Sequence, residues 1–598
     1  MGKTLEPRPW KLRAPEDQAE QDALASRVQN LQAETGLSRL TLQISLSRGL
    51  ESAEAIQHFL SPRLEELKDP FTIQDMSKAI ERLSLARAQK ERLRVFGDYD
   101  VDGTTGAALF TWIFREFGFE FDVRQPDRFK DGYGLNVAAV EDAKAAGVQI
   151  LVTVDCGITS FDAIRRAGEL GIEVIVVDHH QIDSTKGVPP AYAVLDPQRA
   201  DCPSGLKQLC GCGLAFYVAR ALRSHGRQQG WWAPGAEPNL KQHLDLVVLA
   251  TAADMVPLTG DNHTLVRHGL QILKHSKKPG VRALLESAGL AGSAVSGTRD
   301  LTPSHLGFVL GPRINASGRL GSASTAWELL TTDDPLRAAE LAQTLDQMNR
   351  ERAQIQNQIW DEVRRKVETG LAAGKFRHGI VVGDPGWHEG VIGIVASRVV
   401  EAFRKPAAIL SLREDYGKGS VRTYAGKNVL EALKRSSRFL RTFGGHQHAA
   451  GLSVELDQFD AFAEAFDQAL SEIEVDAGAL PLLIEGPCEV EELDVKALQE
   501  IEALGPFGPG NPEPVFTMRA SVKSKRVLKE RHLKLNLAPA GSGRARTIEA
   551  IWFHAAEMME ESGESLETAD SEWAGVPELN RFRGRVTPTF RVRDWRKI

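Results

Sequence analysis

The chain of 598 residues contains few cysteines and no long apolar run. Its five cysteines are odd in number, which argues against a disulfide framework and favours a reducing, cytoplasmic location. No stretch approaches the roughly 20 consecutive apolar residues of a transmembrane helix, so we expect no membrane span. The first thirty residues are charged along their length and lack the apolar core of a signal peptide.

The chain also lacks an excess of basic residues. Lys and Arg together number 73, against 80 Asp and Glu, which gives a net charge of -7. On its face this balance argues against a nucleic-acid-binding protein, because a phosphate polyanion is best met by a basic surface. The 42% hydrophobic and 26% charged residues are ordinary for globular proteins and exclude wholesale disorder. The length predicts about three to five domains.

What the chain does contain is an alternation of apolar runs and helical segments. The apolar runs 93–97, 149–154 and 172–177 are separated by segments with helical periodicity, such as 104–117 and 158–170. Such alternation is typical of βαβ units and predicts a mostly parallel sheet. Right-handed crossovers then place the carboxyl ends of the strands at one edge, where ligands bind in such folds.

Breaks in this pattern divide the chain into domains. A long helix is predicted to begin at Pro335, with Asp334 as its N-cap, and to end at Gly370. Two more helices, 17–34 and 53–59, are predicted before the first strand. The predicted fold class is α/β: a parallel-sheet domain joined by the long helix to a smaller α/β domain, followed by a C-terminal β-barrel. The expected boundaries are 1–75 for an N-terminal helical segment, 76–333 for the parallel-sheet domain, 334–370 for the long helix, 371–478 for the smaller domain and 479–598 for the barrel.

Acidic residues and histidines follow the predicted strands. They are Asp98, Asp100 and Asp102 after the first strand, Asp155 and Asp178-His179-His180 after later ones, and Asp254 at the end of a buried helix. An EF-hand is excluded because a strand precedes the first block, and a zinc protease because a His-Glu-x-x-His helix is missing. Each block alone is more often a solvated or capped turn or a solvated helix end than a functional site. Together they would converge, and converging carboxylates are costly unless cations such as Mn²⁺ or Mg²⁺ neutralise them.

Seven sequence blocks together resemble the RecJ-type exonucleases of the DHH phosphoesterase superfamily, which act on single-stranded DNA. The blocks are 97–105, with Gly-Asp-Tyr-Asp-Val-Asp-Gly, 128–135, 153–157, 178–180, 311–319, 386–396, with Trp-His-Glu-Gly-Val-Ile-Gly, and 444–451, with Gly-Gly-His. The resemblance runs from about Leu93 to near the C-terminus. It implies a DHH domain, a DHHA1-like smaller domain and an OB-like barrel.

The resemblance also implies a ligand set for two ions of Mn²⁺ or Mg²⁺. The implied ligands are Asp98, Asp100, Asp102, Asp155, His179 and Asp254. Asp155 is implied to bridge the ions, and Asp98 to bind directly or to support the other ligands. Two such ions form a clamp for in-line attack of water on phosphorus. His180 is implied to contact the scissile phosphate and to stabilise developing charge.

Strand recognition is implied for residues in several blocks. The candidates are Arg128, Tyr133, Arg313 and Asn315 in the parallel-sheet domain, and Ser420, Arg422, Gly445 and His446 in the smaller domain. Ser420 and Arg422 would bind a 5′-terminal phosphate, since a guanidinium binds phosphate bidentately. For Gly445 and His446 the alternative is a tight turn packed in a core, which the surrounding blocks disfavour. Each of the other candidates, taken singly, has an ordinary surface residue as an equal alternative.

Basic residues are concentrated near the C-terminus, which changes the meaning of the net charge. Lys523, Lys525, Arg526, Lys529, Arg531 and Lys534 form a patch in the barrel suited to single-strand phosphates. The alternative is a solvated strand face. The run 581–597 adds seven Lys or Arg with one Asp, so the surface that meets DNA is predicted to be positive.

The main hypothesis is therefore a two-metal exonuclease that degrades single-stranded DNA from 5′ to 3′ in DNA repair and recombination. The direction comes from the resemblance alone, as do a single-strand-binding protein and a helicase as partners. One alternative is a related enzyme for short oligoribonucleotides or cyclic dinucleotides, which the barrel and the long helix disfavour. Another is a non-catalytic scaffold, which the intact acid and histidine set disfavours. Cys202, Cys210 and Cys212 lack zinc-site spacing, and 505–510 lacks the Gly-Lys-Ser/Thr of a P-loop.

Overall fold

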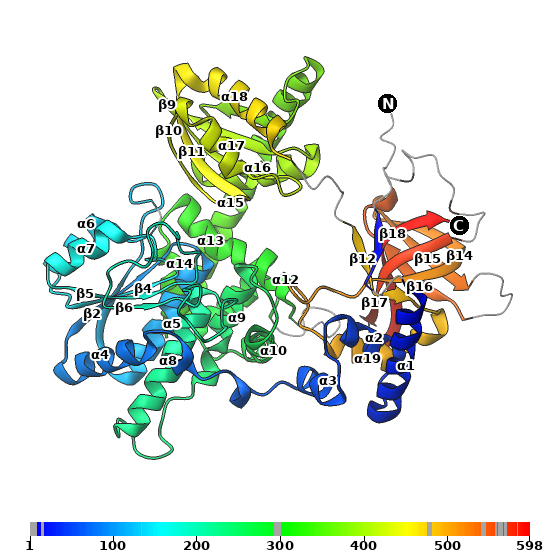
Figure 1. The fold of residues 1–598 in the computed structure, drawn as a ribbon, viewed down its shortest axis with the longest axis horizontal. Coiled ribbons are helices and arrows are strands. Elements are labelled where there is room, and N and C mark those ends of the chain that lie inside the picture. The colour runs from blue at the N-terminus through cyan, green and yellow to red at the C-terminus, as the bar shows by residue number, and fades with distance from the viewer. Residues whose placement is uncertain are drawn as a thin grey trace. The chain divides into compact units, whose positions relative to one another are not determined.

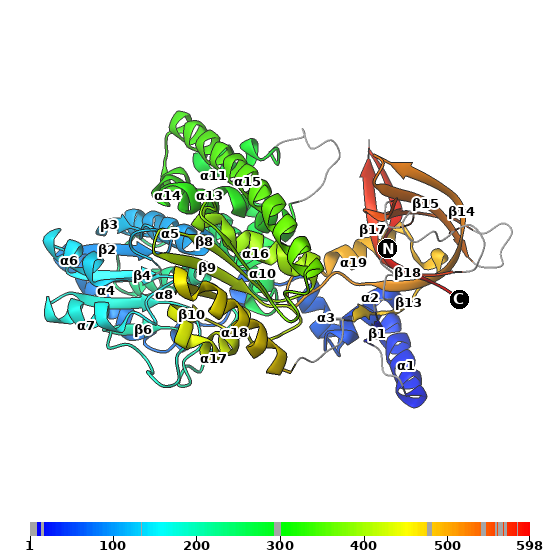
Figure 2. The same ribbon diagram turned by 90° about the horizontal axis from the view of Figure 1, so that it is seen from above.

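The computed structural model describes residues 9–13, 17–132, 134–291, 301–474, 481–539, 546–556, 559, 566, 571–582 and 584–598. These residues form two compact units. The first contains the described residues of Met1–Gly318, Ala323–Gln343 and Leu482–Ile598, and the second those of Arg319–Ser322 and Thr344–Pro481. Figures 1 and 2 show the elements of both units.

The first unit contains a five-stranded parallel sheet in the order β3-β2-β4-β5-β6 (Figure 1). Its strands are β2 (Arg92–Gly97), β3 (Glu120–Arg124), β4 (Ile150–Val154), β5 (Glu173–Val177) and β6 (Ala193–Leu195). The central strands β4 and β5 are almost continuously apolar and buried, as in sheets that carry helices on both faces. The parallel sheet that the sequence predicted is confirmed.

Helices cover both faces of this sheet. The helices of this part of the unit are α4 (Met76–Gln89), α5 (Val101–Phe117), α6 (Val137–Ala145), α7 (Phe161–Glu169), α8 (Gly211–Gln228), α9 (Leu244–Ala253), α10 (Asp261–Lys274), α11 (Pro279–Ser287), α12 (Pro303–His305), the π-helix Leu306–Leu310, α13 (Gly311–Leu320) and α14 (Ser324–Thr331), and the later ones pack on other helices. On one face, α6 and α7 share a core with Leu151 and Val176. On the other, α5 lies so close that a Cβ at Gly106 would be 2.5 Å from a methyl of Val154.

The C-terminal part of the first unit is a six-stranded sheet that forms a five-stranded β-barrel, closed by pairing of β14 with β17, while the two-residue β13 pairs with β14 beside the ring (Figure 2). Its strands are β13 (Gly486–Pro487), β14 (Phe516–Leu528), β15 (His532–Pro539), β16 (Ile548–Trp552), β17 (Ser571–Phe582) and β18 (Arg585–Lys597). Phe516, Trp573 and Phe590 are fully buried in its core. This structure confirms the predicted barrel.

The N-terminal segment packs on the barrel. β1 (Trp10–Leu12) pairs in parallel with β12 (Leu482–Ile484). α1 (Gln18–Thr35) and α3 (Ala53–Leu60) lie where helices were predicted. Between them lies a helix that the sequence analysis did not predict, α2 (Arg39–Ser47), which buries Leu40 and Ile44 in the barrel core with α19 (Val495–Ala503). The segment therefore completes the barrel.

The turn-rich segment 505–512 joins the barrel to the parallel-sheet part of the same unit. The N–H of Leu258 donates to the C=O of Pro509 at 2.7 Å. A ring nitrogen of His263, on α10, lies 3.2 Å from the C=O oxygen of Gly505. Leu258 follows Asp254 by four residues, so this joint lies close in the chain to one of the predicted metal ligands.

The second unit has a five-stranded mixed sheet in the order β10-β11-β9-β8-β7, with β7 and β8 parallel. Its elements are β7 (Ile380–Asp384), α16 (Glu389–Phe403), β8 (Ala407–Leu412), β9 (Tyr416–Arg422), α17 (Val429–Arg435), β10 (Leu440–Gly445), β11 (Ala449–Glu455) and α18 (Phe459–Glu472). The long helix is α15 (Pro335–Ala372). The predicted N-cap is confirmed, because the Leu336 N–H donates to Asp334 Oδ1 at 2.9 Å. The predicted end at Gly370 is wrong by two residues, because the helix continues to Ala372. Gly370 instead allows close packing of the Phe376 ring, which would lie 2.1 Å from a Cβ at that position.

Candidate metal centre and strand-binding residues

Acidic and imidazole groups from four segments converge at the carboxyl edge of the parallel sheet. Asp98 follows β2, Asp155 follows β4, Asp178-His179-His180 follows β5, and Asp254 follows α9. The ligand atoms form three groups, in each of which all atoms lie within 4.8 Å of one another. The groups are Asp98, Asp100 and Asp155; Asp102, His179 and Asp254; and Asp155, His179 and His180. Asp155 and His179 each belong to two groups, so they lie in the middle of the cluster.

Asp155 is held there by an uncommon backbone conformation. Its φ is 61°, in the left-handed region, and its N–H donates to the C=O of Val177 at 3.0 Å. The first turn of α8 packs closely against Asp155 at Gly211. A side chain does not fit there, because a Cβ at Gly211 would lie 2.8 Å from the Cβ of Asp155. A non-glycine residue in this region costs roughly 1–3 kcal/mol, and such residues cluster at functional sites.

Two more carboxylates are fixed by helix N-termini. The buried carboxylate of Asp102 accepts the N–H of Gly211 at 2.6 Å and that of the next residue at 2.8 Å, in the first turn of α8. Asp100 caps α5 by accepting the N–H of Gly103 at 3.1 Å. A Cβ at Gly103 would lie 2.5 Å from the backbone of Asp98, so only glycine fits. Protein contacts alone therefore position both carboxylates.

The sequence analysis did not assign a role to one residue that organises this cluster, Asp178. Its carboxylate is fully buried, accepts the N–H of Ile158 at 2.9 Å and lies 2.7 Å from Nδ1 of His180. Burial alone would lower the pKa of His180, but the hydrogen bond and the charge of Asp178 outweigh it and raise the pKa to about 9. The contact with Asp178 therefore favours the cationic form of His180, and 44% of its side chain is exposed. The signal was present, since Asp178 directly precedes the two histidines.

The cluster carries too little positive charge for its carboxylates. Burial, and then the charges of neighbouring carboxylates, raise the pKa of Asp155 well above its usual value and that of Asp254 to about 8. The pKa of Asp98 is raised for the same two reasons. Among the described residues, the buried Oδ1 of Asp98 has no hydrogen-bond partner. Five carboxylates with the single positive charge of His180 and the imidazole of His179 beside them fit a divalent cation.

Four strand-binding residues were expected in the first unit: Arg128, Tyr133, Arg313 and Asn315. Tyr133 lies outside the described residues. The guanidinium carbon of Arg128 lies 5.1 Å from the centre of the Tyr99 ring. Arg313 and Asn315 stand on α13, which packs on the same residue: a Cβ at Gly318 would lie 2.9 Å from the C=O oxygen of Tyr99. Arg128 and helix α13, which carries Arg313 and Asn315, therefore both contact Tyr99, the residue between Asp98 and Asp100.

The four residues expected in the second unit lie on neighbouring strands. Ser420 and Arg422 stand on β9, and Nη1 of Arg422 donates to Oγ of Ser420 at 2.9 Å. Gly445 ends β10 with a φ of 138°, a conformation that side chains rarely adopt. The N–H of His446 then donates to the C=O of Ala449 at 2.9 Å. Because Ala449 pairs with Arg422, the histidine turn and the Ser–Arg pair lie close together in the sheet.

The expected basic patch lies on the β14–β15 hairpin of the barrel. Lys523, Lys525 and Arg526 are exposed on β14, Lys529 and Arg531 follow in the turn, and Lys534 stands on β15. Arg526 lies opposite Lys534, which is paired with Glu549 at 2.6 Å. Lys529 and Glu530 have positive φ angles of 48° and 58°, which hold the turn in a strained conformation.

The basic run at the C-terminus differs from this hairpin. Four of its arginines, Arg581, Arg591, Arg593 and Arg596, form ion pairs with Glu502, Glu513, Glu578 and Glu572 at 2.5–3.0 Å. Paired charges attract phosphate less strongly than unpaired ones. The run therefore adds less to a positive surface than its composition predicts.

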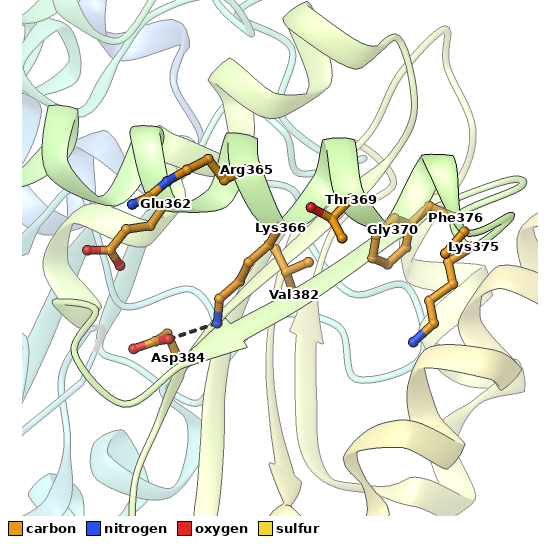
Figure 3. Close-up of a pocket in the computed structure, with 10 residues that line it drawn as sticks. Glu362, Arg365, Lys366, Thr369, Gly370, Lys375, Phe376, Val382 and Asp384 are labelled. Atoms are coloured by element: carbon orange, nitrogen blue, oxygen red, sulfur yellow. Dashed lines mark hydrogen bonds and ion pairs between the residues drawn. The ribbon is translucent and has the colours of Figure 1, made fainter.

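A cavity of about 610 Å³ in the second unit contains none of the predicted site residues (Figure 3). It lies between the C-terminal half of α15 and β7. On its wall, Nζ of Lys366 pairs with Asp384 at 2.7 Å, while Phe376 and Val382 supply apolar surface.

The cysteines take part in packing. All five are free and buried. Cys210 caps α8, since its Sγ accepts the N–H of Gly213 at 3.4 Å.

Among the helices of the described residues, none is long and apolar enough to cross a membrane.

Comparison with protein families divides the chain into three matched parts. Residues 92–251 match the DHH family, N-terminal domain; residues 375–472 match the DHHA1 domain; and residues 484–594 match the RecJ OB domain. The three matches fall on the parallel sheet, the smaller mixed sheet and the barrel, respectively.

Whole-chain comparisons find relatives of the same kind. The chain is 36% identical to the single-stranded-DNA-specific exonuclease RecJ of Dickeya dadantii, over 92% of this chain and 94% of that protein. It is 37% identical to the Escherichia coli protein of the same name, over 85% of this chain and 88% of that protein. Its fold is similar to the crystal structure of Thermus thermophilus RecJ in complex with Mn²⁺, with a TM-score of 0.79 and 28% identity, over 99% of this chain and 80% of that one.

Proposed function

The chain belongs to the RecJ family of exonucleases, and from this premise we propose that it removes nucleotides from the 5′ end of single-stranded DNA by hydrolysis. The observation that carries the proposal is the convergence of five aspartates and two histidines at one edge of the parallel sheet. These residues are Asp98, Asp100, Asp102, Asp155, Asp254, His179 and His180. Such a set of hard oxygen ligands and imidazole suits divalent-metal hydrolysis of phosphodiesters.

We assign Asp98, Asp100, Asp102, Asp155, His179 and Asp254 as ligands of two Mn²⁺ or Mg²⁺ ions. When bound, the ions supply Lewis acidity and neutralise charge at the phosphate. Asp155 would be the carboxylate common to both ions, as the resemblance to the family implies, and its place in two of the three ligand groups is compatible with this role. Its buried carboxylate is the centre around which the others are arranged.

His180 serves as the fixed cation beside the scissile phosphate. Asp178 binds its Nδ1 and orients the ring, and Nε2 would donate to a phosphate oxygen. Asp178 and the backbone hold the ring in place. The imidazole is therefore already oriented to stabilise the negative charge that develops on the phosphate.

The remaining candidates bind the strand. Ser420 and Arg422 form a pocket for the 5′-terminal phosphate. The turn at Gly445 and His446 contacts the next phosphates through the imidazole of His446, because the backbone N–H of that residue is bonded to Ala449. Arg128, Arg313, Asn315 and Tyr133 complete the contacts near the cluster, and the basic patch of the barrel holds the strand further along. A basic hairpin of this kind suits the backbone of a single strand.

The cellular setting stays a proposal that the family supports. It comprises DNA repair and recombination in the cytoplasm, with a single-strand-binding protein and a helicase as partners. The domain boundaries at 75, 333, 370 and 478 are likewise retained as proposals.

The test uses the purified full chain with Mn²⁺ and strands labelled at one end. We expect label at the 5′ end to be released as mononucleotide from single strands, while duplex is left intact. Hydrolysis of dinucleotide substrates alone would contradict the proposed substrate. Release of label that begins at the 3′ end would contradict the proposed direction. Failure to hydrolyse any strand with any divalent metal would support a scaffold instead.

A further inference from the structure

A π-helix, Leu306–Leu310, lies between α12 and α13. π-Helical turns are rare and often mark functional sites. Leu306 and Leu310 are fully buried, whereas Phe308 between them is 70% exposed. Two residues span about half a helical turn, so Phe308 points away from the side that Leu306 anchors.

The buried side of this π-helix packs on the elements that carry the acid cluster. A Cβ at Gly307 would lie 3.1 Å from the C=O oxygen of Ala252, two residues before Asp254. A Cβ at Gly311 would lie 3.4 Å from Ala253 and 3.7 Å from Val101. Val101 stands between Asp100 and Asp102. The π-helix therefore touches the chain immediately beside three of the proposed metal ligands.

Two further observations mark this rim. Met255, directly after Asp254, has a φ of 59° and is 52% exposed. Nη1 of Arg313 donates to the C=O of Val309 at 2.7 Å, which ties a proposed phosphate-binding arginine to the π-helix. Single exposed apolar residues are common on protein surfaces. What distinguishes Phe308 is its place in the chain, between Gly307, which lies against the segment that leads to Asp254, and Val309, whose C=O accepts from Arg313.

We propose that Phe308 is a base-stacking residue, which takes one unpaired base of the strand whose backbone lies at the acid cluster. This inference rests on the proposed function. An aromatic face stacks on any base, so the contact is independent of sequence. It requires a base that is free of its complementary partner, because a paired base keeps its faces covered by its neighbours. Phe308 thereby contributes to the preference for single strands.

Four variants of the full chain separate stacking from other roles. Phe308→Ala and Phe308→Leu remove the ring, Phe308→Trp keeps a stacking face, and Leu336→Ala removes another exposed apolar side chain, 78% exposed on α15, as a control. We expect Phe308→Ala and Phe308→Leu to raise KM for an oligonucleotide by about tenfold with kcat nearly unchanged. Phe308→Trp and Leu336→Ala should match the parent chain. A wild-type KM in Phe308→Ala, or rescue of KM by leucine, would overturn the proposal.

A second readout locates the stacked base. Binding is measured for strands that carry one abasic nucleotide at successive positions, in the presence of Ca²⁺ to suppress cleavage. In the parent chain, one position should weaken binding most, and that position should lose its effect in Phe308→Ala, as expected for a coupled pair. If every abasic position has the same effect in both chains, Phe308 does not stack on a base. Mn²⁺ affinity and melting temperature should be equal in both, and loss of Mn²⁺ binding in Phe308→Ala would instead show a structural role.

The two proposals fail separately. If the parent chain neither binds nor cuts single strands, the proposed function fails. If it does both and the variants of Phe308 behave as the parent chain does, only the stacking inference fails.

Discussion

The acid cluster and the basic hairpin of the barrel carry opposite charge and are built in opposite ways. In the cluster, Asp102 and Asp155 are almost wholly buried and their positions are set by backbone hydrogen bonds and by glycines that admit them. On the hairpin, Lys523 and Lys525 are exposed on a strand whose outer half contributes little to the core. Removal of one side chain from a buried, interlocked site should abolish its function. Each exposed charge should instead contribute a separate, smaller part of strand affinity.

The largest effect is expected at the centre of the cluster. Asp155→Ala should lower the rate of strand cleavage roughly a thousandfold or more, because the carboxylate shared by both metal positions is removed. Strand binding should stay measurable, since the proposed contacts of Arg422, His446 and the basic patch are retained. The measurement is single-turnover cleavage with a parallel binding assay. Asp162→Ala, which removes an exposed carboxylate of α7, is the matched control and should cleave normally. Near-normal turnover in Asp155→Ala would contradict the assignment.

A smaller loss is expected when the partner of His180 is neutralised. Asp178→Asn keeps the shape of the side chain but removes the charge that holds His180 in its cationic form, so we expect kcat to fall about a hundredfold. KM should stay within a few-fold, because the strand contacts are untouched. A change in KM alone would show that Asp178 serves binding rather than charge stabilisation.

At the joint between the barrel and the parallel-sheet part, the expected effect is on the free energy of unfolding and not on the rate of cleavage. Burial, and then the charge of Arg267, lower the pKa of His263 to about 4. Between pH 6.5 and 4 the unfolded chain takes up a proton at His263 that the folded chain does not, so the free energy of unfolding should fall as the pH is lowered through this window, by roughly 2 kcal/mol.

Denaturant unfolding at several pH values measures this contribution. It should be present in the parent chain and absent in His263→Gln, while His275→Gln, at an exposed histidine, should keep it. Equal pH dependence in the parent chain and in His263→Gln would show that the joint does not hold a neutral imidazole.

The smallest effect is expected on the hairpin. Lys523→Glu combined with Lys525→Glu should weaken strand binding by about fivefold to tenfold and reduce the slope of affinity against salt concentration, because fewer counterions are released. Lys186→Glu with Lys207→Glu, at exposed positions in the parallel-sheet part, should leave both unchanged. A salt slope identical to that of the parent chain would place the hairpin off the path of the strand.

The sequence predicted the parts that follow from periodicity and chain order. The parallel sheet could be predicted because β4 and β5 are continuous apolar runs, and the convergence of acids at one edge follows from the handedness of the crossovers. Asp178 was not singled out, since its role depends on a hydrogen bond to His180 that spacing does not reveal. The left-handed conformation of Asp155 likewise arises from the close approach of Gly211.

Other features depend on tertiary contacts that a local pattern misstates. The sequence of α2 alternates apolar and polar residues, a pattern more typical of a strand, yet it forms a helix because the barrel core receives Leu40 and Ile44. The arginines near the C-terminus looked like a DNA-binding run, but several are paired with glutamates distant in sequence, such as Arg581 with Glu502. Net charge is therefore a poor guide here, because it counts buried aspartates of the cluster and glutamates paired with arginines together with the exposed lysines of the hairpin.

The most direct test of the account is the number of Mn²⁺ ions bound per chain, measured by calorimetric titration of the parent chain and of Asp155→Ala. The account predicts two ions in the parent chain and at most one, weakly bound, in the variant, because the shared carboxylate is the common ligand of both positions. Two ions bound with equal affinity by both chains would contradict it and would place the metals elsewhere.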